Sequence, residues 1–235
     1  MNLILLFETD FVSSHQVRLT DRRFQHIQSI FKAELGQTLV VGKINGLIGV
    51  GQITAFNKNF LEMDVTLQRQ PPAALDLILI MALPRPPMLK RTLQCAASLG
   101  IKKIIILNFS RVEKNFWQAS SLRPDAIQQQ LVLGLQQAKD TVMPEVILKE
   151  RLKPFVEDEL PFLIKGRKAF VAHPSQKEGL PKKVSGGVVL IIGPEGGLVD
   201  FEVELLKSKG VQAVNLGSRI LRFENVLPFA VGKMF

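Results

Sequence analysis

The chain contains the stretch Val188-Val-Leu-Ile-Ile-Gly-Pro-Glu-Gly-Gly-Leu198, in which five apolar residues lead directly into a glycine-rich loop. An unbroken run of Val, Leu and Ile of this length is typical of a strand that is buried on both faces, as in a parallel sheet. Residues 188–192 therefore predict a central strand of a parallel α/β sheet, and residues 193–197 predict the loop at its carboxyl end.

The loop combines conformational freedom with one charged side chain. Gly193, Gly196 and Gly197 allow backbone turns with positive φ and leave room for a close neighbour. Pro194 stiffens the turn, and Glu195 places a carboxylate just past the end of the strand. Ligands of open α/β sheets bind at this edge. Because many glycine-rich turns bind nothing, the loop alone leaves both interpretations open.

Length and composition indicate a globular protein. The chain has 235 residues, of which 46% are hydrophobic and 22% are charged, enough for one large domain or two smaller ones. No apolar run approaches the roughly 20 residues of a membrane span. A single cysteine excludes an intrachain disulfide and a cysteine-based metal cluster. We expect a cytoplasmic protein with no membrane attachment.

The positive charge of the chain is concentrated after residue 72. The formal net charge is +9, with +1 on residues 1–72 and +8 on residues 73–235. A basic balance favours a polyanionic partner, of which RNA and DNA are the usual cases. Many basic proteins bind no nucleic acid, so the charge supports this interpretation without deciding it.

The first seventy residues predict a small β-barrel with one helix. Residues 38–41, 47–56 and 61–67 have strand-like patterns, and Asn45-Gly46 between the first two is a strong hairpin signal. One helix interrupts the strands and ends before Gly36. Its apolar face is expected to contain Phe24, Ile27, Ile30 and Phe31.

A polar segment with two prolines, residues 68–74, predicts a domain boundary, and the pattern changes after it. Apolar strand-like runs then alternate with helices, which argues for a parallel α/β sheet. The expected strands are residues 77–81, 103–107, 146–148, 168–172, 188–192 and 212–216. The expected helices are residues 87–99, 124–139, 200–209 and a terminal helix.

Two glycine turns, residues 193–197 and 216–219, follow strands of this sheet and can line one crevice. Their exposed backbone N–H and C=O groups could hold an adenine and a ribose without charged side chains. The chain has no phosphate-binding Gly-x-x-x-x-Gly-Lys-Ser/Thr motif, and Gly-x-Gly-x-x-Gly follows none of its strands. These absences favour another adenosine cofactor over ATP or NAD.

The segment before the last helix is a second candidate for chemistry. Arg222 and Glu224 lie where the chain enters the helix, and Asn225 is a good N-cap residue. Pro228 would fall in the first turn, where a missing N–H has no cost. An ordinary capped helix with a surface arginine and glutamate explains the same spacing. The histidines are scattered without metal-ligand spacing, so we expect no metal site.

These motifs resemble the RsmE family of 16S rRNA (uracil-N3)-methyltransferases, which belongs to the SPOUT superfamily. The resemblance rests on Ile192-Gly-Pro-Glu-Gly-Gly-Leu198 followed by Leu216-Gly-Ser-Arg-Ile-Leu-Arg-Phe-Glu224, and it extends more weakly over nearly the whole chain. It implies a PUA-like, RNA-binding β-barrel over residues 1–70. It also implies a SPOUT methyltransferase domain over residues 73–235, with a parallel sheet and a C-terminal trefoil knot.

The resemblance further implies that a homodimer methylates uracil N3 at a single uridine of 16S rRNA, either free or in the small ribosomal subunit. S-adenosyl-L-methionine would bind among three loops. The cofactor-binding residues implied are Leu83, Ile192, Gly193, Pro194, Glu195, Gly196, Gly197, Leu216, Gly217, Ile220 and Leu221. The catalytic residues implied are Arg222, which would stabilise negative charge on the base, and Glu224, which would orient Arg222 or help to remove the proton.

Several positions depart from the usual pattern of the family, mainly beside the target base. The family's Leu-Arg-Thr-Glu-Thr-Ala reads Leu221-Arg-Phe-Glu-Asn-Val226, so both threonines are absent. The serine that begins a capping box after the glycine loop is Val199, which leaves Asp200 as an alternative cap beside the retained Glu202. Two alternatives therefore stay open: a SPOUT methyltransferase for another rRNA or tRNA site, and a non-catalytic RNA-binding paralogue.

Overall fold

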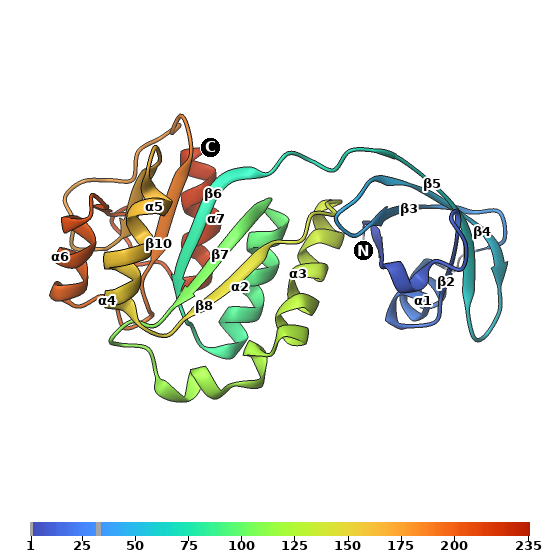
Figure 1. Ribbon diagram of the computed structural model, residues 1–235, viewed down its shortest axis with the longest axis horizontal. Coiled ribbons are helices and arrows are strands. Elements are labelled where there is room, and N and C mark those ends of the chain that lie inside the picture. The colour runs from blue at the N-terminus through green and yellow to red at the C-terminus, as the bar shows by residue number, and fades with distance from the viewer. Residues whose placement is uncertain (1, 32–33) are drawn as a thin grey trace. The chain divides into compact units, whose positions relative to one another are not determined.

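A computed structural model describes residues 2–31 and 34–235 of the chain (Figure 1). The side chains of Ile30 and Phe31, which the sequence places on the apolar face of the first helix, lie outside the described set. Within the described residues, no helix is both long enough and apolar enough to cross a membrane.

The chain divides into two compact units, each with its own sheet. The first unit contains Met1–Ala73 and Val132–Met143, and the second contains Ala74–Leu131 and Pro144–Phe235. The helix α3 (Pro124–Ala138) therefore contributes residues to both units. The periodicity of the sequence predicts this helix, but it gives no sign that the last turns pack with the first unit.

A five-stranded sheet forms the first unit, in the order β1-β3-β4-β5-β2. β1 and β3 are parallel, and the other neighbours are antiparallel. The expected hairpin between β3 and β4 is confirmed, with Asn45 at a φ of 54°. β1 and β2 are too short to show a pattern in the sequence. The strands are β1 (Ile4–Leu6), β2 (Gln16–Leu19), β3 (Thr38–Lys43), β4 (Ile48–Phe56) and β5 (Leu61–Arg69).

The helix of the first unit is α1 (Arg22–His26), continued by a π-helical turn, η2 (Ile27–Phe31). Asp21 caps α1, because its side chain accepts a hydrogen bond from the N–H of Arg23. Phe24 and Ile27 are buried, as predicted. They share a core with strand residues that include Ile4, Leu6, Val17, Leu19, Leu61 and Met63.

A buried ion pair ties the first unit together. The guanidinium of Arg23 donates to both carboxylate oxygens of Asp10, at 2.6 and 2.7 Å, and to the carbonyl oxygen of Leu5 at 2.6 Å. It also pairs with Asp21 at 2.8 Å. Burial raises the pKa of Asp21, but the hydrogen bonds from Arg23 outweigh this effect and hold that pKa below its ordinary value. One side chain thus joins β1, the turn η1 (Glu8–Asp10) and α1.

A six-stranded sheet forms the second unit, in the order β11-β9-β10-β6-β7-β8. Every neighbouring pair is parallel, which confirms the predicted parallel α/β sheet. The strands are β6 (Leu75–Ala82), β7 (Ile101–Leu107), β8 (Glu145–Lys149), β9 (Lys168–Ala172), β10 (Val188–Ile192) and β11 (Gln212–Val214).

Helices pack on both sides of this sheet. α7 (Phe223–Met234) contacts α2 (Pro86–Ser98) and β10, and α5 (Leu160–Ile164) also contacts β10. Figure 1 shows α5 and α7 on opposite sides of β10. The remaining helices of this unit include α6 (Asp200–Ser208), as predicted, and α4 (Leu152–Pro154), which the sequence did not indicate.

The position of β10 determines where the site can form. β10 lies between β9 and β6, with Ile192 level with Ala172 on one side and with Met81 on the other. All five of its residues are buried. Because the three strands are parallel and in register, the turns that follow them leave at the same edge of the sheet.

Arg23→Ala is expected to destabilise the first unit by about 3–5 kcal/mol, because it leaves the Asp10 carboxylate buried without its partner. The chain has no tyrosine and its single tryptophan lies in the second unit, so hydrogen–deuterium exchange of β2 and β5 is the suitable measurement. The control, Arg18→Ala, removes a half-exposed guanidinium that pairs with Glu62 at the surface and should cost about 0–1 kcal/mol. Equal losses of protection in the two variants would contradict the role given to the buried pair.

Candidate functional site

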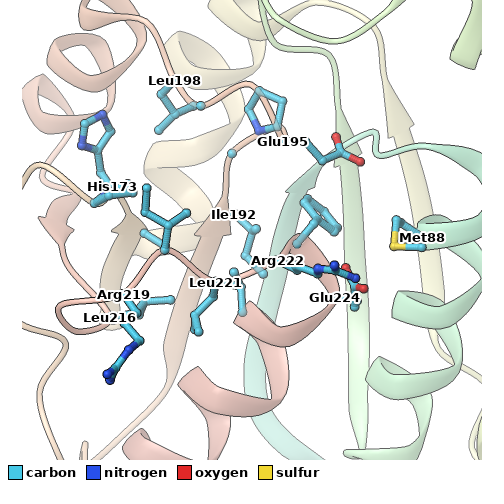
Figure 2. Close-up of a pocket in the computed structure, with 18 of the residues that line it drawn as sticks. Met88, His173, Ile192, Glu195, Leu198, Leu216, Arg219, Leu221, Arg222 and Glu224 are labelled. Atoms are coloured by element: carbon cyan, nitrogen blue, oxygen red, sulfur yellow. The ribbon is translucent and has the colours of Figure 1, made fainter.

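A pocket of about 530 Å³ opens at the carboxyl ends of β9, β10 and β11, within the second unit (Figure 2). Four segments of the chain line it. They are the first turns of α2, residues 172–174 at the end of β9, residues 192–198 around the glycine loop, and residues 216–226 after β11. Gly196, Ser218 and Asn225 are not among the lining residues. The parallel sheet brings these segments together, since each follows a strand at the same edge.

Most of the site residues expected from the sequence line this pocket. From the glycine loop and the segment after β11 they are Ile192, Gly193, Pro194, Glu195, Gly197, Leu216, Gly217, Ile220, Leu221, Arg222 and Glu224.

Leu83 and Gly196 are not among the lining residues. Leu83 is 1% exposed and its N–H donates to the carbonyl oxygen of Leu107 at 3.2 Å, so it packs in the core at the end of β6. Gly196 faces Arg111, whose Nη1 donates to the Gly196 carbonyl oxygen at 2.6 Å. Both residues support the backbone around the pocket without lining it.

The sequence patterns missed several lining residues. Arg85, Met88 and Arg91 reach the pocket from the start of α2, and His173 reaches it from the turn after β9. The signal that could have found them is their position, because each follows a predicted strand at the ligand-binding edge. After β6, the resemblance pointed to the turn near Leu83 and not to the helix that follows this turn.

Close packing shapes the glycine loop. A Cβ on Gly193 would lie 2.8 Å from Leu198 Cγ, so a side chain at this position would force the loop to move. Gly197 has a φ of 77° and donates its N–H to the carbonyl oxygen of Pro194 at 2.8 Å, which closes a tight turn.

A buried carboxylate holds the start of α6 beside the loop that follows β7. Glu202 is fully buried, and its two oxygens accept the N–H groups of Ser110 at 2.7 Å and Val199 at 3.0 Å. The proposed Asp200 cap is wrong: Val199 is the N-cap and Asp200 is the first helical residue. Because valine has no side-chain acceptor, only the glutamate half of a capping box is present.

Asn215 holds the second glycine turn. Its side-chain oxygen accepts the N–H of Gly217 at 3.2 Å, and its amide donates to the carbonyl oxygen of Gln176 at 2.7 Å. Gly217 has a φ of 137°, and no atom lies within 4 Å of the place where its Cβ would be. Ile220 is 85% exposed, so the pocket is open to solvent along this turn.

Arg222 and Glu224 reach the pocket from the start of α7. Figure 2 shows both side chains on the side of Met88, across the pocket from His173. Arg91 Nη1 lies 4.0 Å from Glu224 Oε1, so α2 places a second guanidinium beside the carboxylate.

α7 begins earlier than the sequence suggested. Arg222 is its N-cap, so Asn225 is an exposed residue of the first turn and the predicted Asn225 cap is wrong. Pro228 consequently lies inside the helix, where it cannot donate a hydrogen bond to the carbonyl oxygen of Glu224. Phe223 is 7% exposed, and its burial at the first helical position explains the early start.

The pocket has an apolar wall, and most of its charged lining residues are basic. The apolar wall includes Ile192, Leu198, Leu216, Leu221 and Val226. The charged lining residues are Arg85, Arg91, Arg219, Arg222, Glu195 and Glu224, so arginines outnumber glutamates. Among the residues described, no cluster of His, Cys, Asp and Glu could hold a metal ion. The arrangement suits an uncharged heterocycle in the pocket and an anionic partner around it.

The region that contains this pocket matches a known protein family. Residues 71–234 match the family model described as an RNA methyltransferase domain. The chain belongs to this RNA methyltransferase family. The matched region contains all four segments that line the pocket.

Named relatives confirm the resemblance to RsmE. The chain is 28% identical over 230 residues to ribosomal RNA small subunit methyltransferase E of Treponema pallidum, with 95% of this chain and 86% of that protein covered. It is 23% identical over 228 residues to ribosomal RNA small subunit methyltransferase E 1 of Borreliella burgdorferi, with 95% and 93% covered. The chain is therefore an RsmE-type member of the RNA methyltransferase family.

Two solved structures have the same fold. The ribosomal RNA small subunit methyltransferase E of Neisseria gonorrhoeae, bound to S-adenosyl methionine, aligns with a TM-score of 0.73 at 20% identity over 97% of this chain and 96% of that chain. A Legionella pneumophila protein in complex with the bound cofactor SAM aligns with a TM-score of 0.75 at 21% identity, over 98% and 95%. Both likenesses show that this chain shares their α/β fold with its parallel sheet.

Glu202→Ala is expected to destabilise the second unit of this RNA methyltransferase by about 3 kcal/mol, because two buried N–H groups lose their acceptor. Trp117 reports on this region, since its indole N–H donates to Asn108 at 3.0 Å in the loop after β7. Urea unfolding followed by tryptophan fluorescence measures the change. The control, Glu204→Ala, removes an exposed pair with Lys207 on the same helix and should cost less than about 0.5 kcal/mol. A loss of unfolding free energy no larger than that of Glu204→Ala would contradict the role of Glu202 in holding the start of α6 beside the loop after β7.

Proposed function

We propose that this protein transfers a methyl group from S-adenosyl-L-methionine to N3 of a uridine in 16S rRNA. The observation that supports this best is a pocket that is lined by two glycine turns and by several arginines, in a chain of RsmE type. The relatives from T. pallidum and B. burgdorferi are named as small-subunit rRNA methyltransferases. The N. gonorrhoeae enzyme, which has the same fold, binds S-adenosyl methionine.

Backbone groups hold the cofactor in this proposal. Leu216 and Leu221 provide N–H and C=O groups for the adenine, and Ile192 and Leu198 provide apolar surface beside it. This set fits an adenosine, because an uncharged heterocycle needs apolar contacts and a few neutral donors and acceptors. Gly217 keeps the turn free of a side chain. S-adenosyl-L-methionine supplies an electrophilic methyl group when it is bound.

Arg222 and Glu224 act on the target base. N3 of uracil is weakly acidic and must lose its proton before or during methyl transfer. Arg222 stabilises the negative charge that develops on the base, and Glu224 orients Arg222 or accepts the proton. A positioned general base typically contributes ~10²–10⁴ in rate, and alignment of the methyl group with N3 supplies much of the rest. Arg91, 4.0 Å from Glu224, helps to position that carboxylate.

The charge distribution supports an RNA substrate. Residues 73–235 have a net charge of +8, and four of their arginines line the pocket. Such a surface attracts the phosphates of a polyanion over a long range. The substrate is 16S rRNA or the small ribosomal subunit, which places the protein in the cytoplasm.

The C-terminal chain is proposed to form a trefoil knot. β10 lies between β9 and β6 in the sheet, and both of these strands precede it in the sequence. Residues 173–187, which connect β9 to β10, form backbone hydrogen bonds with Asn215 after β11 and, through residues 183–184, with the end of α7. The connection between β9 and β10 therefore lies against the C-terminal segment, both just after β11 and at the end of α7. This close contact supports the proposal of a knotted C-terminus.

We propose that residues 1–70, which form the sheet of the first unit, are a PUA-like barrel that binds RNA, and that residues 73–235 are the methyltransferase domain, whose residues 132–143 pack with the first unit. Its five strands are antiparallel except for the β1–β3 pair, and α1 packs into their common core. A small curled sheet with one helix is consistent with such a module.

A homodimer whose partner subunit completes the site is also proposed, and α7 offers a surface for it. Phe229 and Phe235 are 43% and 48% exposed. Pro228 and Gly232 are exposed as well, and residues three or four apart lie on the same face of a helix. This face is therefore largely apolar and exposed in the single chain, with only Lys233 Nζ over the Phe229 ring at 6.0 Å from its centroid, as expected of an interface.

Arg222→Ala is expected to lower kcat by about 10²–10³-fold with unchanged cofactor affinity, because the developing charge on the base loses its partner. The assay incubates the protein with S-adenosyl-L-methionine and undermodified small subunits or naked 16S rRNA. Methylation is then read as a reverse-transcription stop at a uridine. The control, Lys165→Ala, removes an exposed charge that precedes β9, at the edge opposite the pocket, and should keep full activity.

The wild type tests the proposed function in this assay, and the Arg222→Ala variant tests the role of that residue. Wild-type protein that methylates neither substrate would contradict the proposed function, and methylation of tRNA in their place would favour the alternative SPOUT activity. Full activity of the Arg222→Ala variant would remove the role given to that residue while leaving the function in place.

Phe229→Glu is expected to convert the dimer to a monomer, because it places a charge in the apolar face of α7. Sedimentation equilibrium should give twice the chain mass of 26.2 kDa for the wild type and the single mass for the variant. Phe162→Glu, on α5, is the matched control, since Phe162 is 79% exposed and lies outside the proposed interface. A wild type that sediments as a single chain would contradict the dimer.

A further inference from the structure

A second pocket, distinct from the methyltransferase pocket, lies within the first unit. Its volume is about 310 Å³, and α1 and the last turns of α3 provide its walls. The lining residues are Arg22, Arg23, His26, Leu133, Gln136 and Gln137. All six belong to the first unit, so the pocket is a property of that unit alone.

Hydrogen bonds fix both walls of this pocket. On α1, the guanidinium of Arg23 is held by the buried ion pair described above. On α3, the carbonyl oxygen of Gln136 accepts the N–H groups of Asn2 and Leu3 at 3.2 and 3.1 Å. The carbonyl oxygen of Gln137 accepts the side-chain amide of Asn2 at 2.9 Å. The pocket is therefore formed before any ligand arrives.

A buried donor in the pocket lacks an acceptor. Gln136 is 2% exposed, and its Nε2 makes no hydrogen bond to any residue that the structure describes. Leaving a buried amide unpaired costs stability, and such groups in native proteins call for an explanation. An acceptor atom supplied by a ligand would satisfy it.

The pocket also has a positive charge that lies outside the buried ion pair. The charge of Arg23 is offset by Asp10 and Asp21. Arg22 is exposed and forms no ion pair with the described part of the chain, and no acidic side chain is among the lining residues. A guanidinium beside an amide donor suits a ligand with several negatively charged acceptor oxygens, which is the chemistry of a phosphate.

We propose that this pocket binds a phosphate group of the RNA backbone, with Arg22 pairing with the phosphate oxygens and the Gln136 amide donating to one of them. The inference rests on the proposed function, because it assigns to the same rRNA substrate a contact on the first unit. A phosphate contact holds the register of the RNA on the protein and reads no sequence.

The test measures the affinity of the full chain for 16S rRNA transcribed in vitro, over a series of salt concentrations. Arg22→Ala should weaken binding about tenfold and lower the slope of log affinity against log salt by about 0.7, the value for one phosphate on a single strand. Gln136→Leu keeps the approximate shape of the side chain without the donor. It should weaken binding by about threefold to tenfold with an unchanged salt slope, since it removes no charge.

Two controls separate binding from folding and from general charge. Gln136→Leu should leave the thermal midpoint unchanged or raise it, because the amide that it removes is buried without an acceptor. Lys58→Ala removes one positive charge from the exposed turn between β4 and β5 and should change the affinity by less than about twofold.

If the wild type binds rRNA and both pocket variants bind as tightly, the inference is overturned and the proposed function stands. Should the leucine variant fold poorly, Arg22→Ala decides, since its side chain is exposed: a lowered salt slope supports the inference and an unchanged slope overturns it. A wild type that binds no 16S rRNA would overturn the proposed function and this inference together.

Discussion

The burial of β10 is the constraint on which the rest of the structure depends. β9 and β6 occupy its backbone hydrogen-bonding groups on either side, and all five of its side chains are buried. The chain leaves this strand at Gly193, where a Cβ would lie 2.8 Å from Leu198 Cγ. The turn therefore has no side chain there, and backbone groups are left to line the pocket.

Two residues outside the pocket turn these flexible loops into fixed walls. Glu202 joins the start of α6 to the loop after β7 through two N–H groups, and Asn215 anchors the turn after β11. A wall made of glycine backbone needs such support, because glycine is the residue with the largest conformational freedom. If these loops became ordered only when a ligand binds, the entropy lost on ordering would reduce the affinity for that ligand.

Local patterns predicted what local chemistry decides, namely the central strand, the glycine loops and the parallel sheet. Arg91 and His173 were missed because no motif marks them, and only their position after a predicted strand, at the edge where ligands bind, points to the pocket. The cap at Asn225 was predicted wrongly because the burial of Phe223, a tertiary effect, decides where α7 begins. The packing of Val132–Met143 with the first unit likewise depends on contacts that are remote in the sequence.

The proposed function depends on whether the pocket at the end of β10 binds S-adenosyl-L-methionine. Isothermal titration calorimetry of the full chain with this cofactor measures that binding. We expect saturable binding at one site per chain, in competition with S-adenosylhomocysteine, which shares the adenosine that the loops would hold. A correctly folded protein that gives no heat of binding at any cofactor concentration would contradict the proposed function.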